Sequence, residues 1–168
     1  RSPERWLEQV TINRGTNDGV DTNMAVITAE GMIGKIQSVS KTAATVQLLT
    51  GFDQFNRISA TIARDGNDIF GLIEAYDKET NSLLFKIIEE SDKDLEDDEL
   101  VVSSGLGGLF PAGLPIGTVK DVIPDQYGLT RTALVEPAAD MYDINHVIVV
   151  DRSLSGENGI QEMEEDEE

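Results

Sequence analysis

Short runs of β-branched and other apolar residues, separated by Gly, Asn and Asp, recur along the whole of this 168-residue chain. Ile58, Ala60 and Ile62 alternate with smaller or polar neighbours, which is the period-two pattern of a half-buried strand. Many short strands at fairly even spacing indicate an all-β sandwich or barrel. We predict strands at Val10–Asn13, Met24–Thr28, Ile33–Val39, Thr45–Leu49, Arg57–Ala63, Ile69–Tyr76, Leu83–Ile88, Leu100–Ser103, Ile116–Val122, Arg131–Glu136 and His146–Val150.

Outside these runs the chain offers little regular structure. Residues 1–9 are predicted to be a short N-terminal helix or a linker, with Ser2 as N-cap and Pro3 in the first turn. Residues 10–151 carry the β structure, and a charged loop is expected at 89–99. Residues 152–168 are rich in Glu and poor in apolar side chains, so we expect a disordered acidic tail.

Two segments resemble each other. Ile33-Gly34-Lys35-Ile36-Gln37-Ser38-Val39 and Ile116-Gly117-Thr118-Val119-Lys120-Asp121-Val122 both follow a strand and a Gly-containing turn and precede another strand. A duplicated strand unit suits a protein with two barrels. Chance similarity between strands rich in Gly and Val is the alternative.

Composition excludes several function classes. The formal charge of −19 repels phosphate backbones, so no nucleic-acid partner is expected. The absence of Cys excludes disulfides, zinc–thiolate sites and thiol nucleophiles. No run approaches the roughly 18 apolar residues of a membrane-spanning helix. Since the sequence starts at Arg1, we expect a fragment of a longer protein.

The chain is poor in residues that could carry catalysis. Its single histidine, His146, lies in an apolar run, and Ser103 and Ser104 precede a Gly-rich turn without the spacing of a nucleophile elbow. A degenerate serine hydrolase would have to use His146, while the acidic loops leave a calcium- or carbohydrate-binding β module as the other alternative. We predict no catalytic residue, no metal site and no cofactor.

The turn after Ser104 is the most unusual segment. It concentrates apolar residues among glycines, where no long regular element can form, so the turn either plugs a barrel mouth or presents a contact surface. Burial is favoured, since each buried Leu or Phe contributes about 2 kcal/mol. The candidate interaction or structural residues are Gly105, Leu106, Gly107, Gly108, Leu109, Phe110 and Pro111.

Residues 103–119, SSGLGGLFPAGLPIGTV, resemble a family signature of the form T-S-G-x-G-G-x-F-P-x-G-x-x-(I/V)-G-x-V. This is the signature of the MreC family of rod shape-determining proteins. Ser103 stands where the family commonly has Thr. Supporting matches lie at residues 13–20, 24–28, 31–36 and 45–50, so the resemblance extends from about Trp6 to Asp151. The acidic segment 89–99 and the tail are not family hallmarks.

The resemblance implies the extracytoplasmic domain of a non-catalytic scaffold for peptidoglycan elongation and rod shape. The implied fold is two small six-stranded β-barrels in a chymotrypsin-like double-barrel arrangement without an active site, and we place much of the second barrel at about residues 52–99. The implied location is the outer face of the cytoplasmic membrane, anchored by a transmembrane helix absent from this fragment. Implied partners are a second copy in a full-length homodimer, MreD, the MreB system, RodA and penicillin-binding proteins.

Overall fold

The computed structural model describes residues 8–52, 56–64, 68–87, 95–96, 98–106, 110–124 and 130–151. Within them lie eleven strands and two single-turn 3₁₀ helices, η2 (Thr16–Asp18) and η3 (Leu49–Gly51). The predicted all-β fold is therefore confirmed. Each predicted strand overlaps an observed one, with ends that differ by at most two residues. The predicted N-terminal helix or linker, apart from its last two residues, and the tail 152–168 lie outside the described residues.

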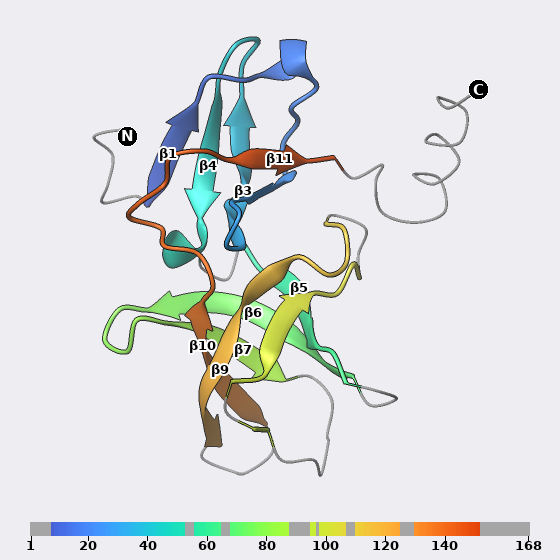
Figure 1. Cartoon of the computed structure of the whole chain (residues 1–168), viewed down its shortest axis with the longest axis vertical. Coiled ribbons are helices and arrows are strands. Elements are labelled where there is room, and N and C mark those ends of the chain that lie inside the picture. Colours follow the sequence, from blue (N-terminus) through green and yellow to red (C-terminus); the bar gives the residue numbers. More distant parts are fainter. Residues whose placement is uncertain are drawn as a thin grey trace, which may run out of the picture.

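The first unit is an antiparallel sheet of five strands. Their order is β1-β4-β3-β2-β11, so the two ends of the chain supply its two edges. In Figure 1 β11 returns from the other unit and overlaps β3 and β4 in this view, while it pairs with β2 at the edge of the sheet. The strands in this order are Gln9–Ile12, Ala44–Leu48, Met32–Val39, Ala25–Ile27 and Ile148–Val150.

The second unit is a closed barrel of six antiparallel strands, seen below the first sheet in Figure 1. Around the barrel they run β10-β7-β6-β5-β8-β9. In chain order they are β5 (Ile58–Ile62), β6 (Ile69–Asp77), β7 (Ser82–Ile87), β8 (Leu100–Ser103), β9 (Pro115–Pro124) and β10 (Arg131–Pro137). Alternate residues of β5 point inward, and Ile58, Ala60 and Ile62 are buried.

The expectation of two six-stranded barrels is correct for the second unit and needs correction for the first. Among the described residues, no strand pairs with the free edges of β1 and β11, so the first sheet has five strands and stays open. The spacing of strands in the sequence could not reveal this difference, because it does not determine which strands become neighbours.

The two similar segments form β3 of the first sheet and β9 of the barrel, and the two strands share their irregularities. In β3 the pairing with β2 skips Ile33, and the pairing with β4 skips Gln37. In β9 the pairing with β8 skips Ile116, and the pairing with β10 skips Lys120. The skipped residues occupy the same places in the sequence alignment. A β-bulge is a specific local feature, so two matched pairs of bulges favour a repeated unit over chance similarity.

Hydrogen bonds outside the ladders repeat as well. Asn23 N–H donates to Ile36 O at 2.8 Å, and Asp98 N–H donates to Val119 O at 2.8 Å. Asn23 and Asp98 also share a left-handed backbone, with φ of 66° and 67°. The unit β2-β3-β4 therefore corresponds to β8-β9-β10, and the main insertion in the second copy is the Gly-rich turn between β8 and β9.

One contiguous cluster of buried apolar side chains runs through both units. Its largest fully buried members include Met32 and Ile36 in the first sheet and Phe85 and Ile73 in the barrel. No helix among the described residues is long and apolar enough to cross a membrane.

Candidate functional site: an open seam between two strand edges

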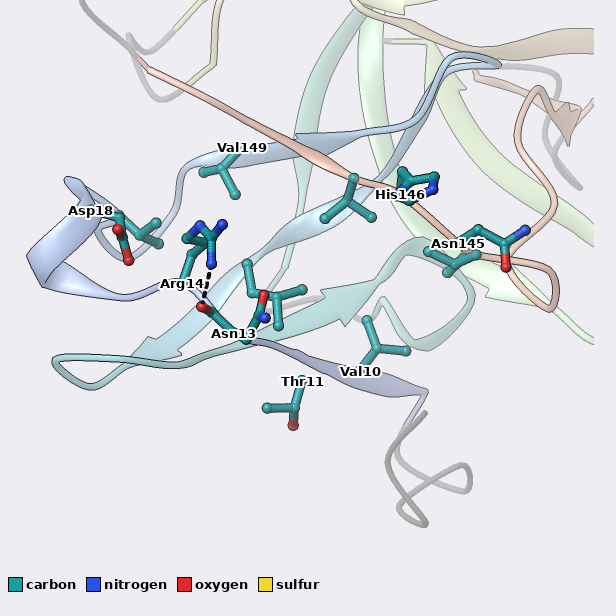
Figure 2. Close-up of a pocket in the computed structure, with 12 residues that line it drawn as sticks. Val10, Thr11, Asn13, Arg14, Asp18, Asn145, His146 and Val149 are labelled. Atoms are coloured by element: carbon teal, nitrogen blue, oxygen red, sulfur yellow. Dashed lines mark hydrogen bonds between the residues drawn. The ribbon is translucent and has the colours of Figure 1, made fainter.

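A concave feature of the described chain lies where the first sheet fails to close. A cavity of about 660 Å³ separates β1 and the residues just after it from β11 and the residues just before it. Figure 2 shows Val10, Thr11 and Arg14 on one side, with His146 and Val149 on the other. We call this cavity the seam. Its volume lies within the range of pockets that accept ligands.

The internal repeat identifies what the seam lacks. In the two copies of the repeat, β2-β3-β4 corresponds to β8-β9-β10. β1 pairs with β4 and β7 pairs with β10, which are the last strands of the two copies, so β1 corresponds to β7. In the same way β11 pairs with β2 and β5 pairs with β8, which are the first strands of the two copies, so β11 corresponds to β5. In the barrel, β6 lies between β7 and β5 and pairs with both. The first sheet has no counterpart of β6 among the described residues, and the seam is the place where it would lie.

The side chains of the seam reflect the missing strand. By register, Val10 and Ile12 correspond to Leu83 and Phe85 of the barrel, which are fully buried. Val149 corresponds in the same way to Ile62, which is also buried. Val10, Ile12, Val147 and Val149 are only partly buried and pack against the edge of the core. The seam therefore exposes apolar surface that the closed barrel removes from water.

The backbone of β1 also faces the seam with unused hydrogen-bonding groups. Leu48 N–H donates to Glu8 O at 2.9 Å, and bonded pairs alternate along an antiparallel ladder. The N–H and C=O groups of Gln9 and Thr11 must then point away from β4, toward the seam. Such an edge is a template for an added strand.

One end of the seam carries a cation, Arg14, and a carboxylate, Asp18. Arg14 follows β1 and donates from a guanidinium N–H to the Asn13 carbonyl at 3.0 Å. When the register of β1 is extended two residues past its end at Ile12, Arg14 corresponds to Ile87, which lies two residues beyond Phe85 in the barrel. Asp18, the acidic residue of the seam, instead accepts a hydrogen bond from Gly15 N–H at 3.2 Å.

The Gly-rich turn predicted from sequence lies elsewhere, on the barrel, and its described part is mixed. Phe110 is 7% exposed and belongs to the core cluster, and Pro111 is buried. Leu106 is 58% exposed. Gly105 has a φ of +76°, a backbone that favours glycine. Gly107, Gly108 and Leu109 lie outside the described residues, so the choice between plug and contact surface stays a prediction for them.

Ser103 has a structural role in this turn. Its hydroxyl donates to Pro111 O at 2.6 Å and accepts from Leu114 N–H at 2.9 Å, and the residue is buried. His146 is exposed and lines the seam, where no serine lies among the lining residues. The Ser103 hydroxyl, which a hydrolase would need as its nucleophile, is therefore engaged in the hydrogen bonds that close the turn.

An ion pair organises the described end of the acidic connection. The Arg64 guanidinium contacts both carboxylate oxygens of Glu99, with Arg64 Nε 2.8 Å from Glu99 Oε2. Glu96 N–H also donates to Glu99, at 2.7 Å. The hydrogen bond from Arg64 lowers the pKa of Glu99 below its usual range, although partial burial opposes this shift. No cluster of potential metal ligands occurs in the described ranges, and most of the acidic segment 89–99 falls outside them.

Comparisons with known proteins agree on one family. The family model described as "Rod shape-determining protein MreC, barrel core" matches residues 1–151. The chain belongs to the MreC family. The cell shape-determining protein MreC of Bacillus subtilis is 48% identical over 159 residues, covering 92% of this chain and 55% of the relative. The Listeria monocytogenes MreC is 46% identical over 153 residues, covering 91% and 51%. This chain spans about half the length of these MreC relatives.

Solved MreC structures share the fold. A structure of Listeria monocytogenes MreC is 45% identical, with a TM-score of 0.84, covering 91% of this chain and 72% of that one. MreC from Pseudomonas aeruginosa is 30% identical, with a TM-score of 0.69, covering 89% and 93%. A complex between penicillin-binding protein PBP2 and MreC from Helicobacter pylori contains the same fold, at 21% identity and a TM-score of 0.65, covering 87% of both chains. MreC proteins determine cell shape and are structural proteins.

The sequence identified this family correctly but did not identify the seam. Among the seam residues, only His146 is a candidate for chemistry in the sequence, as the histidine that a degenerate serine hydrolase would have to use. The internal repeat is the sequence signal that could locate the seam. When the two copies of the repeat are aligned together with the strands that accompany them, the copy in the first sheet has one accompanying strand fewer than the copy in the barrel.

Proposed function

We propose that this domain is a non-catalytic scaffold that organises the peptidoglycan-elongation machinery at the outer face of the cytoplasmic membrane. In the full-length protein a transmembrane helix outside this chain would tether it there. Its partners would be penicillin-binding proteins, RodA, MreD, the MreB system and a second copy of itself. Tethering raises the effective concentration of such partners, so even weak contacts suffice.

Membership in the MreC family carries this proposal. The complex of Helicobacter pylori MreC with PBP2 supports a penicillin-binding protein as one partner. A scaffold acts through its surface, and this domain exposes two strand edges beside a partly apolar cavity. Exposed strand edges are a recurrent means of protein recognition.

The hydrolase alternative finds no support in the site. Ser103 is buried and uses its hydroxyl in the turn, while His146 lies in the seam. The calcium alternative has no support in the described residues either, because Glu99 is engaged by Arg64 and Glu96.

A complementation experiment tests the scaffold proposal. The full-length protein carrying this domain is expressed in a rod-shaped bacterium whose own MreC-family gene is deleted. We expect the domain in its tethered form to restore rod shape, and the same protein without the domain to leave round cells. Restoration of rods by the protein lacking residues 8–151 would refute the proposal.

A further inference from the structure

We propose that the seam is a docking site for one β-strand of a protein partner, which completes the first sheet as a six-stranded barrel. The inference starts from strand direction. Neighbours in the first sheet are antiparallel throughout, so β1 and β11, the first and fifth in the order, run in the same direction. One added strand can therefore be antiparallel to both, as β6 is to β5 and β7. An even number of strands then closes the sheet.

The barrel supplies a template for the added strand. The inward residues of β6 are Ile69, Gly71 and Ile73, all buried. Ile69 pairs with Ile62, and the counterpart of Ile62 in the seam is Val149. Ile73 pairs with Phe85, and the counterpart of Phe85 in the seam is Ile12. The seam would thus receive two apolar side chains in an extended segment of about five residues.

The centre of the added strand must be small. Gly71 lies opposite Ile87, and a Cβ built on Gly71 would be 2.3 Å from Lys86 O. The counterpart of Ile87 in the seam is Arg14, a larger side chain. A small central residue therefore both permits close backbone approach and leaves space for the guanidinium. The pattern of the partner strand is apolar–x–small–x–apolar.

Charge complementarity indicates that the partner strand carries a carboxylate. Arg14 takes part in no ion pair among the described residues, although the chain as a whole carries a charge of −19. Exposed His146 lies at the other end of the seam. An acidic residue beside the small central position can pair with Arg14, and Arg–carboxylate pairs give geometric specificity as well as energy.

A partner is favoured over the C-terminal segment of this chain as the occupant. The family model stops at residue 151, directly after β11, so the segment that follows is not part of the shared barrel core. That segment is also strongly acidic and has few apolar residues to fill the positions taken by Ile69 and Ile73.

The probe is a labelled peptide with the sequence of residues 68–77 carrying Leu72→Glu, DIFGEIEAYD, which keeps the apolar–x–small–x–apolar pattern and places a carboxylate beside the central glycine. Its binding to the full chain is measured by fluorescence anisotropy. We expect saturable binding that weakens as salt is raised, and no binding of the same peptide with N-methylated backbone amides. Absence of saturable binding, or equal binding of the N-methylated peptide, would overturn the inference.

Two variants and one control test the seam itself. Thr11→Pro removes an edge N–H without removing a bond to β4, and Arg14→Glu reverses the seam charge. Each should weaken binding at least tenfold while the thermal midpoint changes little. Lys120→Glu, at the exposed bulge of β9, should bind the peptide normally. Normal binding by both folded seam variants would refute the inference.

Other occupants would give different results. If removal of residues 152–168 strengthens peptide binding more than tenfold, the chain's own C-terminal segment is the occupant. If the chain dimerises and Thr11→Pro abolishes the dimer, a second copy is the occupant. Either result overturns the assignment to a different protein. The biological purpose of the seam rests on the proposed scaffold function, but the peptide assay tests only the seam and the complementation assay tests only the function.

Discussion

At the scale of single residues, Phe110 is the test of whether the Gly-rich turn is anchored. Its ring is buried, whereas Leu106 in the same turn is exposed. We expect Phe110→Ala to lower the free energy of unfolding by about 3–5 kcal/mol, because it leaves a cavity in the core. Leu106→Ala is the matched control and should change it by no more than about 0.5 kcal/mol. Chemical denaturation measures both. An unchanged stability of Phe110→Ala, together with lost partner binding, would instead make the turn a docking surface.

The ionisation of Glu99 makes the free energy of unfolding depend on pH. Because Arg64 lowers the pKa of Glu99 in the folded state, the unfolded chain binds this proton more readily. The stabilisation is complete above the ordinary Glu range and is lost as pH falls below that range, through the lowered pKa. At neutral pH we expect Glu99→Gln to cost about 1.5–3 kcal/mol. The difference from the parent protein should shrink in acid.

The control for Glu99 is Glu74→Gln. The Arg57–Glu74 contact is 3.7 Å and more exposed, so its removal should cost about 0–1 kcal/mol. Unfolding free energies measured across the acidic range compare the two variants. A constant cost of Glu99→Gln at every pH would show that charge is not the source of the stabilisation.

At the scale of elements, the repeated glycines of β3 and β9 test the internal repeat. A Cβ on Gly34 would lie 2.0 Å from Gln47 O, and a Cβ on Gly117 would lie 2.1 Å from Glu136 O. We expect Gly34→Ala and Gly117→Ala each to destabilise the protein by about 1–3 kcal/mol through overpacking. Ser38→Ala, on the exposed part of β3, is the control.

Thermal unfolding of these three variants gives the comparison. Similar losses for the two glycine variants would be expected if β3 and β9 occupy equivalent environments. A loss for one glycine and none for the other would contradict that equivalence.

At the scale of the whole molecule, the tail 152–168 is predicted to be dispensable for folding. Its composition provides too little apolar surface to offset the entropy of ordering the chain. A protein truncated at Ser153 should keep its circular dichroism spectrum and its cooperative unfolding. Loss of cooperativity would show that the tail docks on the folded domain.

The sequence by itself determined the class of the fold, the positions of the strands and the family. These depend on local patterns: alternation of apolar residues, turn residues between them, and a signature confined to residues 103–119. The similarity of the segments around Gly34 and Gly117 was visible as well, but only the shared bulges favoured a repeat over chance.

Only the tertiary structure decided which edges remain open. β1 and β11 are separated by 135 residues along the chain, from Ile12 to Ile148, yet they face each other across the seam. Strand pairing depends on backbone hydrogen bonds between distant segments, and each strand looks the same in sequence whether its second edge is paired or free. For the same reason Arg14 resembles an ordinary turn residue in the sequence, and becomes a candidate binding residue only when β1 lacks a neighbour.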